Sequence, residues 1–163
     1  MSESHLAHKP ILKYVFPLIL KPSFDRMERV FERFIESYVK TTDEKYLSED
    51  ELVRNCPDAD LYISGSDQIW NSDINGRIER PYYLSFAPQN KKKISFASSF
   101  GKTKLRDEEV EENKKLLAQY SWISTREQSG ANLVQSLGLN ADAILDPTLW
   151  LTKEQWENVR RIN

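Results

Sequence analysis

The chain has 163 residues, of which 39% are hydrophobic and 29% are charged, and its formal net charge at pH 7 is -2. These values favour one soluble globular domain with a sizeable core and exclude an intrinsically disordered chain. The small net charge gives no general electrostatic reason to bind nucleic acid. Cys56 is the only cysteine, which excludes an internal disulfide and a CxxC site. We interpret it as a structural thiol in a reducing compartment.

Residues 11–20, ILKYVFPLIL, form the most apolar stretch of the sequence. The stretch is shorter than the ~20 residues that cross a bilayer, and Lys13 and Pro17 interrupt it. We expect it to pack on the core, with a peripheral membrane contact as the alternative. His5 and His8 precede it in a polar start, where we expect no metal site.

Apolar residues recur at helical spacing between Ser23 and Lys40, which predicts a helix that begins near Pro22. Packing on the core is the ordinary role of such an apolar stripe, and a partner-binding face is the alternative. The stripe consists of Phe24, Met27, Val30, Phe31, Phe34, Ile35, Tyr38 and Val39.

Four short apolar runs with polar or turn residues on both sides are predicted as strands, at 61–64, 94–97, 122–125 and 143–145. Helices are predicted between them, at 107–120 and 127–138, the second ending at Gly138 as its C′ glycine. Four capping boxes mark three helix starts: Ser48 with Glu51, the overlapping pairs Ser124 with Glu127 and Thr125 with Gln128 at one start, and Thr152 with Gln155.

Strands that alternate with helices predict an α/β fold with a mainly parallel sheet and flanking helices. Residues 72–92 are predicted to form a long loop, because Gly76, Pro81 and Pro88 break any regular element there. The lysines at 91–93 are predicted to be a solvated entrance to the second strand.

A polar cluster follows each predicted strand: GSDQIWN, SSFG, REQSG and DPT, in chain order. Because the carboxyl ends of parallel strands share one edge, and ligands bind in the crevice outside that edge, we predict that these clusters form one ligand site. The candidate binding residues are Gly65, Ser66, Asp67, Gln68, Trp70, Asn71, Ser98, Ser99, Arg126 and Asp146.

Several candidates in the first cluster also have structural roles open to them. Gly65 permits a sharp turn or the close approach of a ligand, and Ser66 or Asp67 can cap the following turn. Trp70 can fill the core or stack on a sugar. Gln68 and Asn71 have donors and acceptors that suit sugar hydroxyls.

The other clusters leave similar alternatives. Ser98 and Ser99 can donate hydrogen bonds to an anion, but no Gly-x-Ser-x-Gly elbow makes either a nucleophile. Arg126, in the first turn of a helix, can bind a carboxylate or phosphate, or pair with Glu127 or Asp146. Asp146 is held extended by the proline after it and can tie loops together or contact a ligand.

The motifs DLYISGSDQIWN, KKISFASSFGK, WISTREQSG, LGLNADAILDPTLWL and TKEQW resemble the polysaccharide pyruvyl transferase family, in the family's order and at compatible spacing. The segment FERFIESYVKTTDEKYLSEDEL is also similar to the helical segment that precedes the first of these motifs in bacterial members. The resemblance spans residues 24–157.

The resemblance implies one half of a B-type glycosyltransferase-like architecture, in which two Rossmann-like domains face a cleft. It implies transfer of a pyruvyl group from phosphoenolpyruvate to two hydroxyls of a cell-surface polysaccharide, as a ketal, with no cofactor. The expected partner is a sugar or lipid-linked oligosaccharide acceptor. The expected location is the cytoplasm, with the inner face of the membrane as one option.

The sequence departs from the family pattern in two respects. We expect it to lack the opening strand with its NYG-like loop, and to lack the second domain, which the resemblance implies would carry the Arg and His residues for the donor. His5 and His8 match no family motif, so the catalytic residues stay unassigned, and the candidates fall on the acceptor side of the cleft.

We therefore expect an N-terminal segment at 1–22, a partial Rossmann-like domain at 23–163, and no activity from this chain alone. A homo-oligomer or a partner half-domain would cover its open face. The alternatives are a non-catalytic glycan-binding or subunit-docking half-domain and a fragment of a nucleotide-sugar glycosyltransferase.

Overall fold

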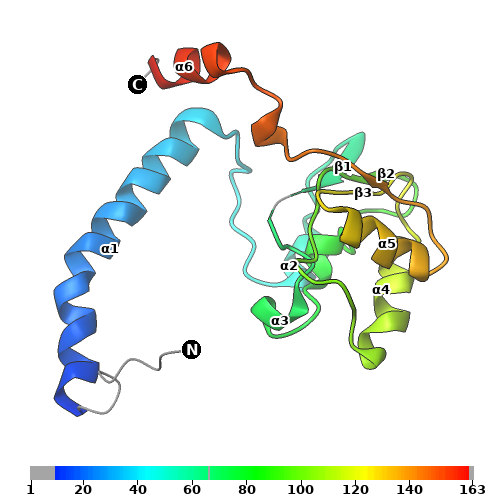
Figure 1. Cartoon of the computed structure of the whole chain (residues 1–163), viewed down its shortest axis with the longest axis horizontal. Coiled ribbons are helices and arrows are strands. Elements are labelled where there is room, and N and C mark those ends of the chain that lie inside the picture. Colours follow the sequence, from blue (N-terminus) through cyan, green and yellow to red (C-terminus); the bar gives the residue numbers. More distant parts are fainter. Residues whose placement is uncertain (1–9, 66, 162–163) are drawn as a thin grey trace. The chain divides into compact units, whose positions relative to one another are not determined.

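The computed structural model describes residues 10–65 and 67–161, with side chains described for 21–65 and 67–158. His5, His8 and Ser66, which the sequence analysis considered, lie outside the described residues. The chain divides into two compact units, one that ends at Lys45 and one that begins at Tyr46. The first unit contains helix α1, and the second contains the described strands and the other described helices (Figure 1).

Helix α1 (Pro10–Tyr38) has 29 residues and continues through Pro17 and Pro22. The prediction that this helix begins near Pro22 was therefore wrong. A proline inside a helix removes one hydrogen bond and costs about 3 kcal/mol, which good helix-forming neighbours can offset. The prediction that residues 11–20 pack on the core concerns side chains outside the described residues.

The apolar stripe of α1 is exposed, so the prediction that it packs on a core was also wrong. Phe24 is 56% exposed and Phe31 is 62% exposed. The physical reason is local: α1 is the one helix that the structure describes in its unit, and no described strand accompanies it. The rings of Phe34 and Tyr38 pack against each other, with centroids 5.0 Å apart.

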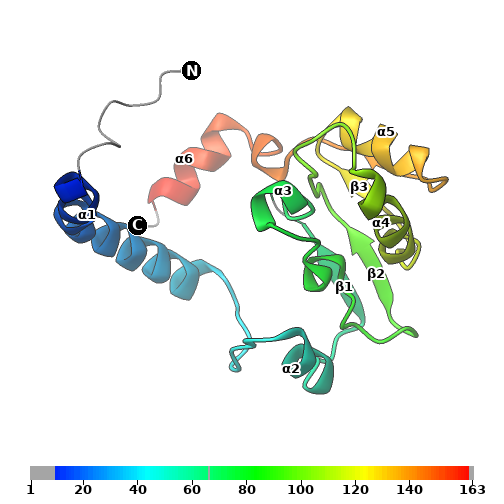
Figure 2. The same ribbon diagram turned by 90° about the horizontal axis from the view of Figure 1, so that it is seen from below.

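The second unit contains a short parallel arrangement of four described strands, as predicted. Strand β1 (Leu61–Ser64) pairs in parallel with β2 (Lys92–Ser95), as Figure 2 shows. Strand β3 (Ser124–Thr125) pairs in parallel with β4 (Asp142–Ala143). Isolated parallel bridges, at Ile94 with Trp122 and at Ser98 with Thr125, align β3 with β2. Strand β2 begins two residues before the predicted run 94–97, and β3 and β4 are shorter than expected.

Buried serine hydroxyls add side-chain hydrogen bonds to the backbone ladder between the strands. Ser95 Oγ donates to the carbonyl of Ser124 (2.9 Å), and Ser124 Oγ donates to the carbonyl of Ser95 (2.8 Å). Ser98 Oγ donates to the carbonyl of Ser64 (3.1 Å). The carbonyls of Ser64 and Ser124 also accept from the backbone N–H groups of Phe96 and Ser98, so the hydroxyls strengthen the link between these short strands.

The described helices of the second unit are α2 (Glu49–Arg54), α3 (Ser72–Asn75), α4 (Val110–Leu117), α5 (Gln128–Ser136) and α6 (Lys153–Arg161), with 3₁₀ turns at Arg80–Tyr83, Asp107–Glu109 and Pro147–Leu149. Helices α4 and α5 correspond to the predicted helices at 107–120 and 127–138. Gly138 has a φ of 81°, as its predicted C′ position requires.

The predicted long loop at 72–92 was wrong in part, because it contains α3 and the 3₁₀ turn at Arg80–Tyr83. The Asn71 side chain caps α3 by accepting from the backbone N–H of Asp73 (3.1 Å). Gly76, with a φ of 77°, ends it. A polar residue before the helix and a glycine after it are enough to form one short turn.

Two of the four capping predictions are confirmed. Ser48 Oγ accepts from the N–H of Glu51 at the start of α2 (3.2 Å), and Thr152 and Gln155 cap each other's N–H groups at α6. The two at α5 were wrong.

The N-cap of α5 is Glu127, and no side-chain bond caps it. The Ser124 hydroxyl is instead used between the strands, and Thr125 Oγ1 donates to the carbonyl of Glu127 (3.0 Å). A hydroxyl that a neighbouring strand engages is no longer free to cap a helix.

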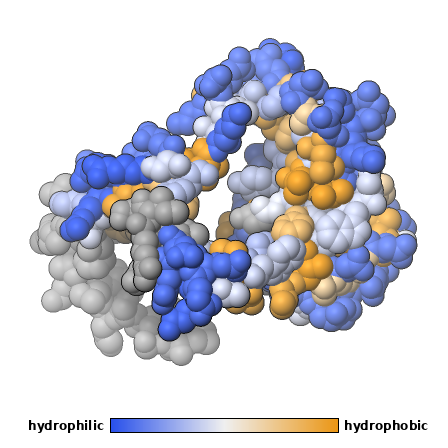
Figure 3. All heavy atoms as spheres, turned by 90° about the horizontal axis from the view of Figure 1, so that it is seen from above, coloured by the Kyte–Doolittle hydropathy of each residue, from blue (hydrophilic) through white to orange (hydrophobic). Residues whose placement is uncertain are grey.

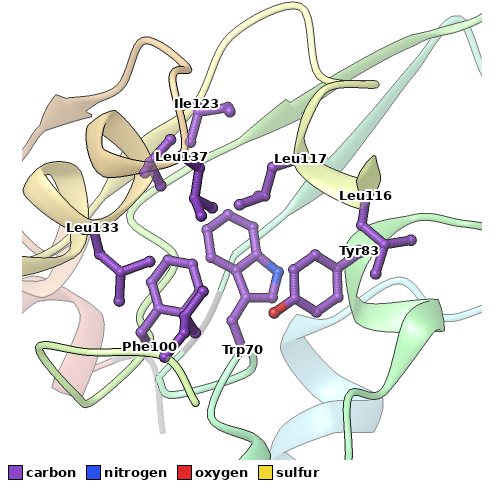
Figure 4. Packing of buried hydrophobic residues seen from close by; sticks show 10 residues of the cluster. Trp70, Tyr83, Phe100, Leu116, Leu117, Ile123, Leu133 and Leu137 are labelled. Carbon is purple, nitrogen blue, oxygen red and sulfur yellow. The ribbon is translucent and has the colours of Figure 1, made fainter. Parts of the chain in front are cut away.

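Trp70 lies at the centre of the main hydrophobic core (Figure 4). Its ring stacks on Tyr83 at a centroid distance of 5.3 Å and lies 5.0 Å from the ring of Phe100. Its indole N–H donates to the carbonyl of Tyr82 (3.2 Å). Leucines and other apolar residues of α4, α5 and neighbouring segments complete the cluster: Leu105, Leu116, Leu117, Ile123, Leu133, Val134 and Leu137.

The prediction of a solvated lysine run was wrong for Lys93, which is 2% exposed. Alternation along β2 turns this side chain inward, where Nζ donates to Gln119 Oε1 (3.0 Å). Burial lowers the pKa of Lys93, because the charged form loses hydration.

Successive side chains of a strand point to opposite faces, and on one face of β1 the apolar side chains are exposed. Leu61 and Ile63 of β1 are 40% and 55% exposed. Figure 3 shows hydrophobic side chains at the surface of the part of the molecule that holds the strands. The mixed α/β class is therefore confirmed, whereas a full Rossmann-like, B-type architecture stays a prediction.

Candidate functional site

Arg126 joins three loops that follow different strands. Its NH2 donates to Asp67 Oδ1 after β1 (2.6 Å), its Nε to Glu127 Oε1 after β3 (2.9 Å), and its NH1 to Asp146 Oδ2 after β4 (3.4 Å). The predicted meeting of polar groups at the carboxyl edge of the strands is therefore observed for Asp67, Arg126 and Asp146. We call Asp67, Arg126, Glu127 and Asp146 together the Arg126 cluster.

A pocket of about 510 Å³ opens beside the cluster. The strands and the loops after them provide its walls: Ile63, Gly65, Asp67, Phe96, Ala97, Arg126, Asp146, Pro147 and Thr148. Its lining is mixed, with apolar Ile63 and Phe96 and the charged residues of the cluster. A pocket of this kind at the ends of parallel strands is the usual place for a small ligand in an α/β fold.

The cluster contains three carboxyl groups and one guanidinium group, so carboxylates outnumber the cation. Hydrogen bonds that Arg126 donates to Asp67, and then to Glu127, hold the pKa of Arg126 above its ordinary value. Hydrogen bonds from Thr148, and then from Arg126, lower the pKa of Asp146. Three of the five N–H groups of Arg126 already donate to carboxylates, and those three carboxylates disfavour an added anion beside it.

Gly65 directly follows β1, close to the backbone of Phe96, which directly follows β2. A Cβ atom at this position would lie 2.5 Å from the backbone oxygen of Phe96, closer than real Cβ contacts. The group that approaches Gly65 closely is therefore the backbone at Phe96, rather than a ligand. Gly65 also lines the pocket.

The rest of the GSDQIWN segment is occupied by structural contacts. Gln68, with a φ of 50°, accepts at Oε1 from Asn71 Nδ2 (2.8 Å), and Asn71 caps α3. Trp70 is 2% exposed, so both faces of its indole are covered and the core-filling alternative holds. Asp67 differs from these residues, because 64% of its side chain is exposed beside the pocket.

Ser98 and Ser99 are completely buried. Ser98 Oγ bonds to the carbonyl of Ser64. Ser99 Oγ donates to Glu127 Oε1 (2.9 Å) and accepts from the N–H of Gly101 (3.0 Å). Ser99 therefore helps to fix Glu127, the carboxylate that Arg126 also contacts, and neither hydroxyl faces the pocket in this structure.

Sequence reasoning missed two aromatic residues near the pocket. Phe96 lines it, and the ring of Trp150 packs edge-on against Phe96 at 5.2 Å. Trp150 is 54% exposed, and its indole N–H donates to the carbonyl of Leu145 (3.1 Å), which fixes the ring. The available signal was its position just after DPT, at a strand end. Trp70 was the tryptophan predicted as a binding residue, because it lies inside the most polar segment.

The described residues show no group of three or more His, Cys, Asp or Glu side chains arranged to hold a metal ion. None of the helices in the described ranges combines the length and apolarity that crossing a bilayer demands.

The strands are parallel and alternate with helices, and a pocket of ligand size lies at their carboxyl ends, so the chain is a mixed α/β protein. The family model for polysaccharide pyruvyl transferase matches residues 6–162, and the chain belongs to this family. No curated protein and no solved structure matches the chain.

Proposed function

We propose that this chain takes part in pyruvyl transfer by holding the sugar acceptor beside the Arg126 cluster. In this reaction the methylene carbon of phosphoenolpyruvate gains a proton and becomes a methyl group. Two sugar hydroxyls each lose a proton and bond to the central carbon. The bond from that carbon to the phosphate oxygen breaks, and phosphate leaves with the remaining proton. The family membership supports the reaction. The net acidic pocket beside Trp150 is the observation that carries the assignment to the acceptor.

The charge of the site favours a sugar over the donor. Phosphoenolpyruvate carries a carboxylate and a phosphate, and three nearby carboxylates would repel it. Among the described residues that line the pocket, Arg126 is the one cation, and its nitrogens are engaged. Sugar hydroxyls, in contrast, donate well to carboxylate oxygens.

The aromatic pair suits the apolar face of a sugar ring. Phe96 lies in the pocket wall, and the exposed indole of Trp150 stands edge-on beside it. An indole held in place by its own N–H bond offers a large flat surface at little cost in side-chain entropy. We therefore assign Asp67 and Asp146 to sugar hydroxyls and Trp150 to the ring face.

The test is saccharide binding to the full chain, measured by titration calorimetry with galactose- and mannosamine-containing oligosaccharides. We expect Trp150→Ala to weaken binding at least ~10-fold, which corresponds to about 1.4 kcal/mol. Trp122→Ala is the matched control, because Trp122 is a partly exposed tryptophan with a bonded indole N–H that lies outside this pocket. Equal losses in the two variants, or no binding to any glycan, would contradict the proposal.

A second measurement separates catalysis from binding. We expect that the chain alone binds the acceptor but releases no phosphate from phosphoenolpyruvate. Phosphate release together with ketal formation would show a donor site within this chain. The second candidate function, a glycan-binding module without catalysis, draws on the same acidic pocket. It predicts binding that is unchanged when phosphoenolpyruvate and a complementary catalytic domain are supplied.

The donor also suggests where the protein acts. Phosphoenolpyruvate is a metabolite of the cytoplasm, and we propose that the chain acts there on an acceptor for a cell-surface polysaccharide.

A further inference from the structure

We propose that α1 pairs with the α1 of a second copy of this chain, in parallel, as a short coiled coil. The helix presents aromatic and apolar residues at alternating spacings of three and four. These residues are Phe24, Met27, Phe31 and Phe34. Alternating steps of this kind form the a and d positions of a heptad repeat, the pattern by which two helices interlock.

The seam is exposed along the length for which side chains are described. Phe24, Met27, Phe31 and Phe34 are between 53% and 62% exposed. Four large apolar side chains in one row would cost free energy in water, at about 25 cal/mol for each Å² of apolar surface. Burying the row against an identical row removes that cost on both helices.

The residues beside the seam favour a parallel pair. Val30 and Ile35 occupy the g and e positions, and in a parallel pair the g residue of one helix faces the next e residue of its partner. Val30 would then face Ile35 of the second copy, and Ser23 would face Glu28 of the second copy. In an antiparallel pair g residues face g residues and e residues face e residues, so the match of Val30 with Ile35 would be lost.

The outer face of α1 argues for a protein partner rather than an anionic surface. Between residues 21 and 40 the basic and acidic side chains nearly balance: Lys21, Arg26, Arg29, Arg33 and Lys40 against Asp25, Glu28, Glu32 and Glu36. Anionic lipids and nucleic acids attract helices that have a clear excess of Lys and Arg. A second copy needs no such excess, because the two helices meet through the apolar seam.

Sedimentation of the full chain over a range of concentrations tests the pairing. We expect a monomer–dimer equilibrium that Phe31→Glu shifts to monomer by at least ~10-fold in dissociation constant, because a charge enters the centre of the seam. Arg29→Glu, on the outer face of the same helix, should leave the equilibrium unchanged. A wild-type chain that stays monomeric at all concentrations would overturn the proposal, and so would equal effects of the two substitutions.

Disulfide formation tests the orientation and does not depend on tolerance of a buried charge. In a Cys56→Ser background, Phe24→Cys should give a covalent dimer on mild oxidation, because a parallel pair sets position 24 beside its own copy. Arg29→Cys should form far less. Equal crosslinking of both variants, or none at position 24, would refute the parallel seam.

Discussion

At the scale of single residues, Arg126 determines whether three strand-end loops stay together. Replacing it with alanine leaves Asp67, Glu127 and Asp146 close to one another without their shared cation. We expect Arg126→Ala to lower the free energy of unfolding by about 1 kcal/mol, since partly exposed ion pairs contribute little individually. It should also abolish detectable saccharide binding.

Urea unfolding monitored by tryptophan fluorescence measures the first effect. Arg77→Ala is the control, because Arg77 is well exposed and pairs with Glu79 away from the pocket. We expect no measurable change there. Full saccharide affinity in Arg126→Ala would show that the cluster does not shape the pocket.

Glu109 gives a pH dependence that can be checked. Burial alone would raise the pKa of Glu109, but hydrogen bonds from Arg106, Ser72 and Lys102 outweigh it and lower the pKa from 4.5 to about 2. The carboxylate therefore contributes stability above about pH 4.5, and this contribution is lost as the pH falls toward about 2.

We expect the melting temperature of the wild type to fall over that window. In Glu109→Gln the fall should be shallower, and stability at pH 7 should be lower by about 1–3 kcal/mol because Lys102 loses a buried partner. Glu108→Gln is the control, with an exposed side chain. Parallel pH profiles for wild type and Glu109→Gln would contradict this interpretation.

At the scale of elements, side-chain hydroxyls contribute to holding the strands in register. Ser124 Oγ donates to the carbonyl of Ser95 and accepts from the N–H of Ala97 (3.1 Å), and Ser124 is fully buried. We expect Ser124→Ala to cost about 1–3 kcal/mol, because two buried backbone groups lose their partner.

Chemical denaturation measures the free energies of unfolding of Ser124→Ala and of the control Ser121→Ala. Ser121 is exposed, three residues earlier, and its removal should change the free energy of unfolding by less than ~0.5 kcal/mol. If the two alanine variants were equally stable, the hydroxyl bonds would not be what holds these short strands together.

The elements also show what the sequence could predict. A short apolar run between polar residues located β1, and a C′ glycine located the end of α5. Helical periodicity placed Phe31 in a core, because spacing defines an apolar face but not what covers it. Ser124 was predicted to cap a helix, since a local capping pattern cannot reveal a neighbouring strand that engages the same hydroxyl.

The candidate site was predicted in outline. The rule for parallel strands located Asp67, Arg126 and Asp146 at one edge, because it depends only on strand direction. The rule could not tell which of Trp70 and Trp150 is buried and which is exposed, since both follow strands in polar segments. Burial in three dimensions makes the first a core residue and leaves the second exposed.

At the scale of the whole molecule, the division at Lys45 predicts independent stability for the larger unit. Residues Thr41–Lys45 are exposed and include a lysine that trypsin recognises. We expect brief trypsin treatment to cut there first and to leave a product beginning at Tyr46 that retains its circular dichroism spectrum and its saccharide affinity. Mass spectrometry identifies the product, and its unfolding would argue that the first unit is needed for the fold.

The near contact between position 65 and the backbone of Phe96 also constrains how this protein can evolve. Any side chain there would force two neighbouring strands apart and widen the floor of the pocket. A related protein with a larger residue at this position must have rebuilt its floor, and we would expect it to accept a different sugar.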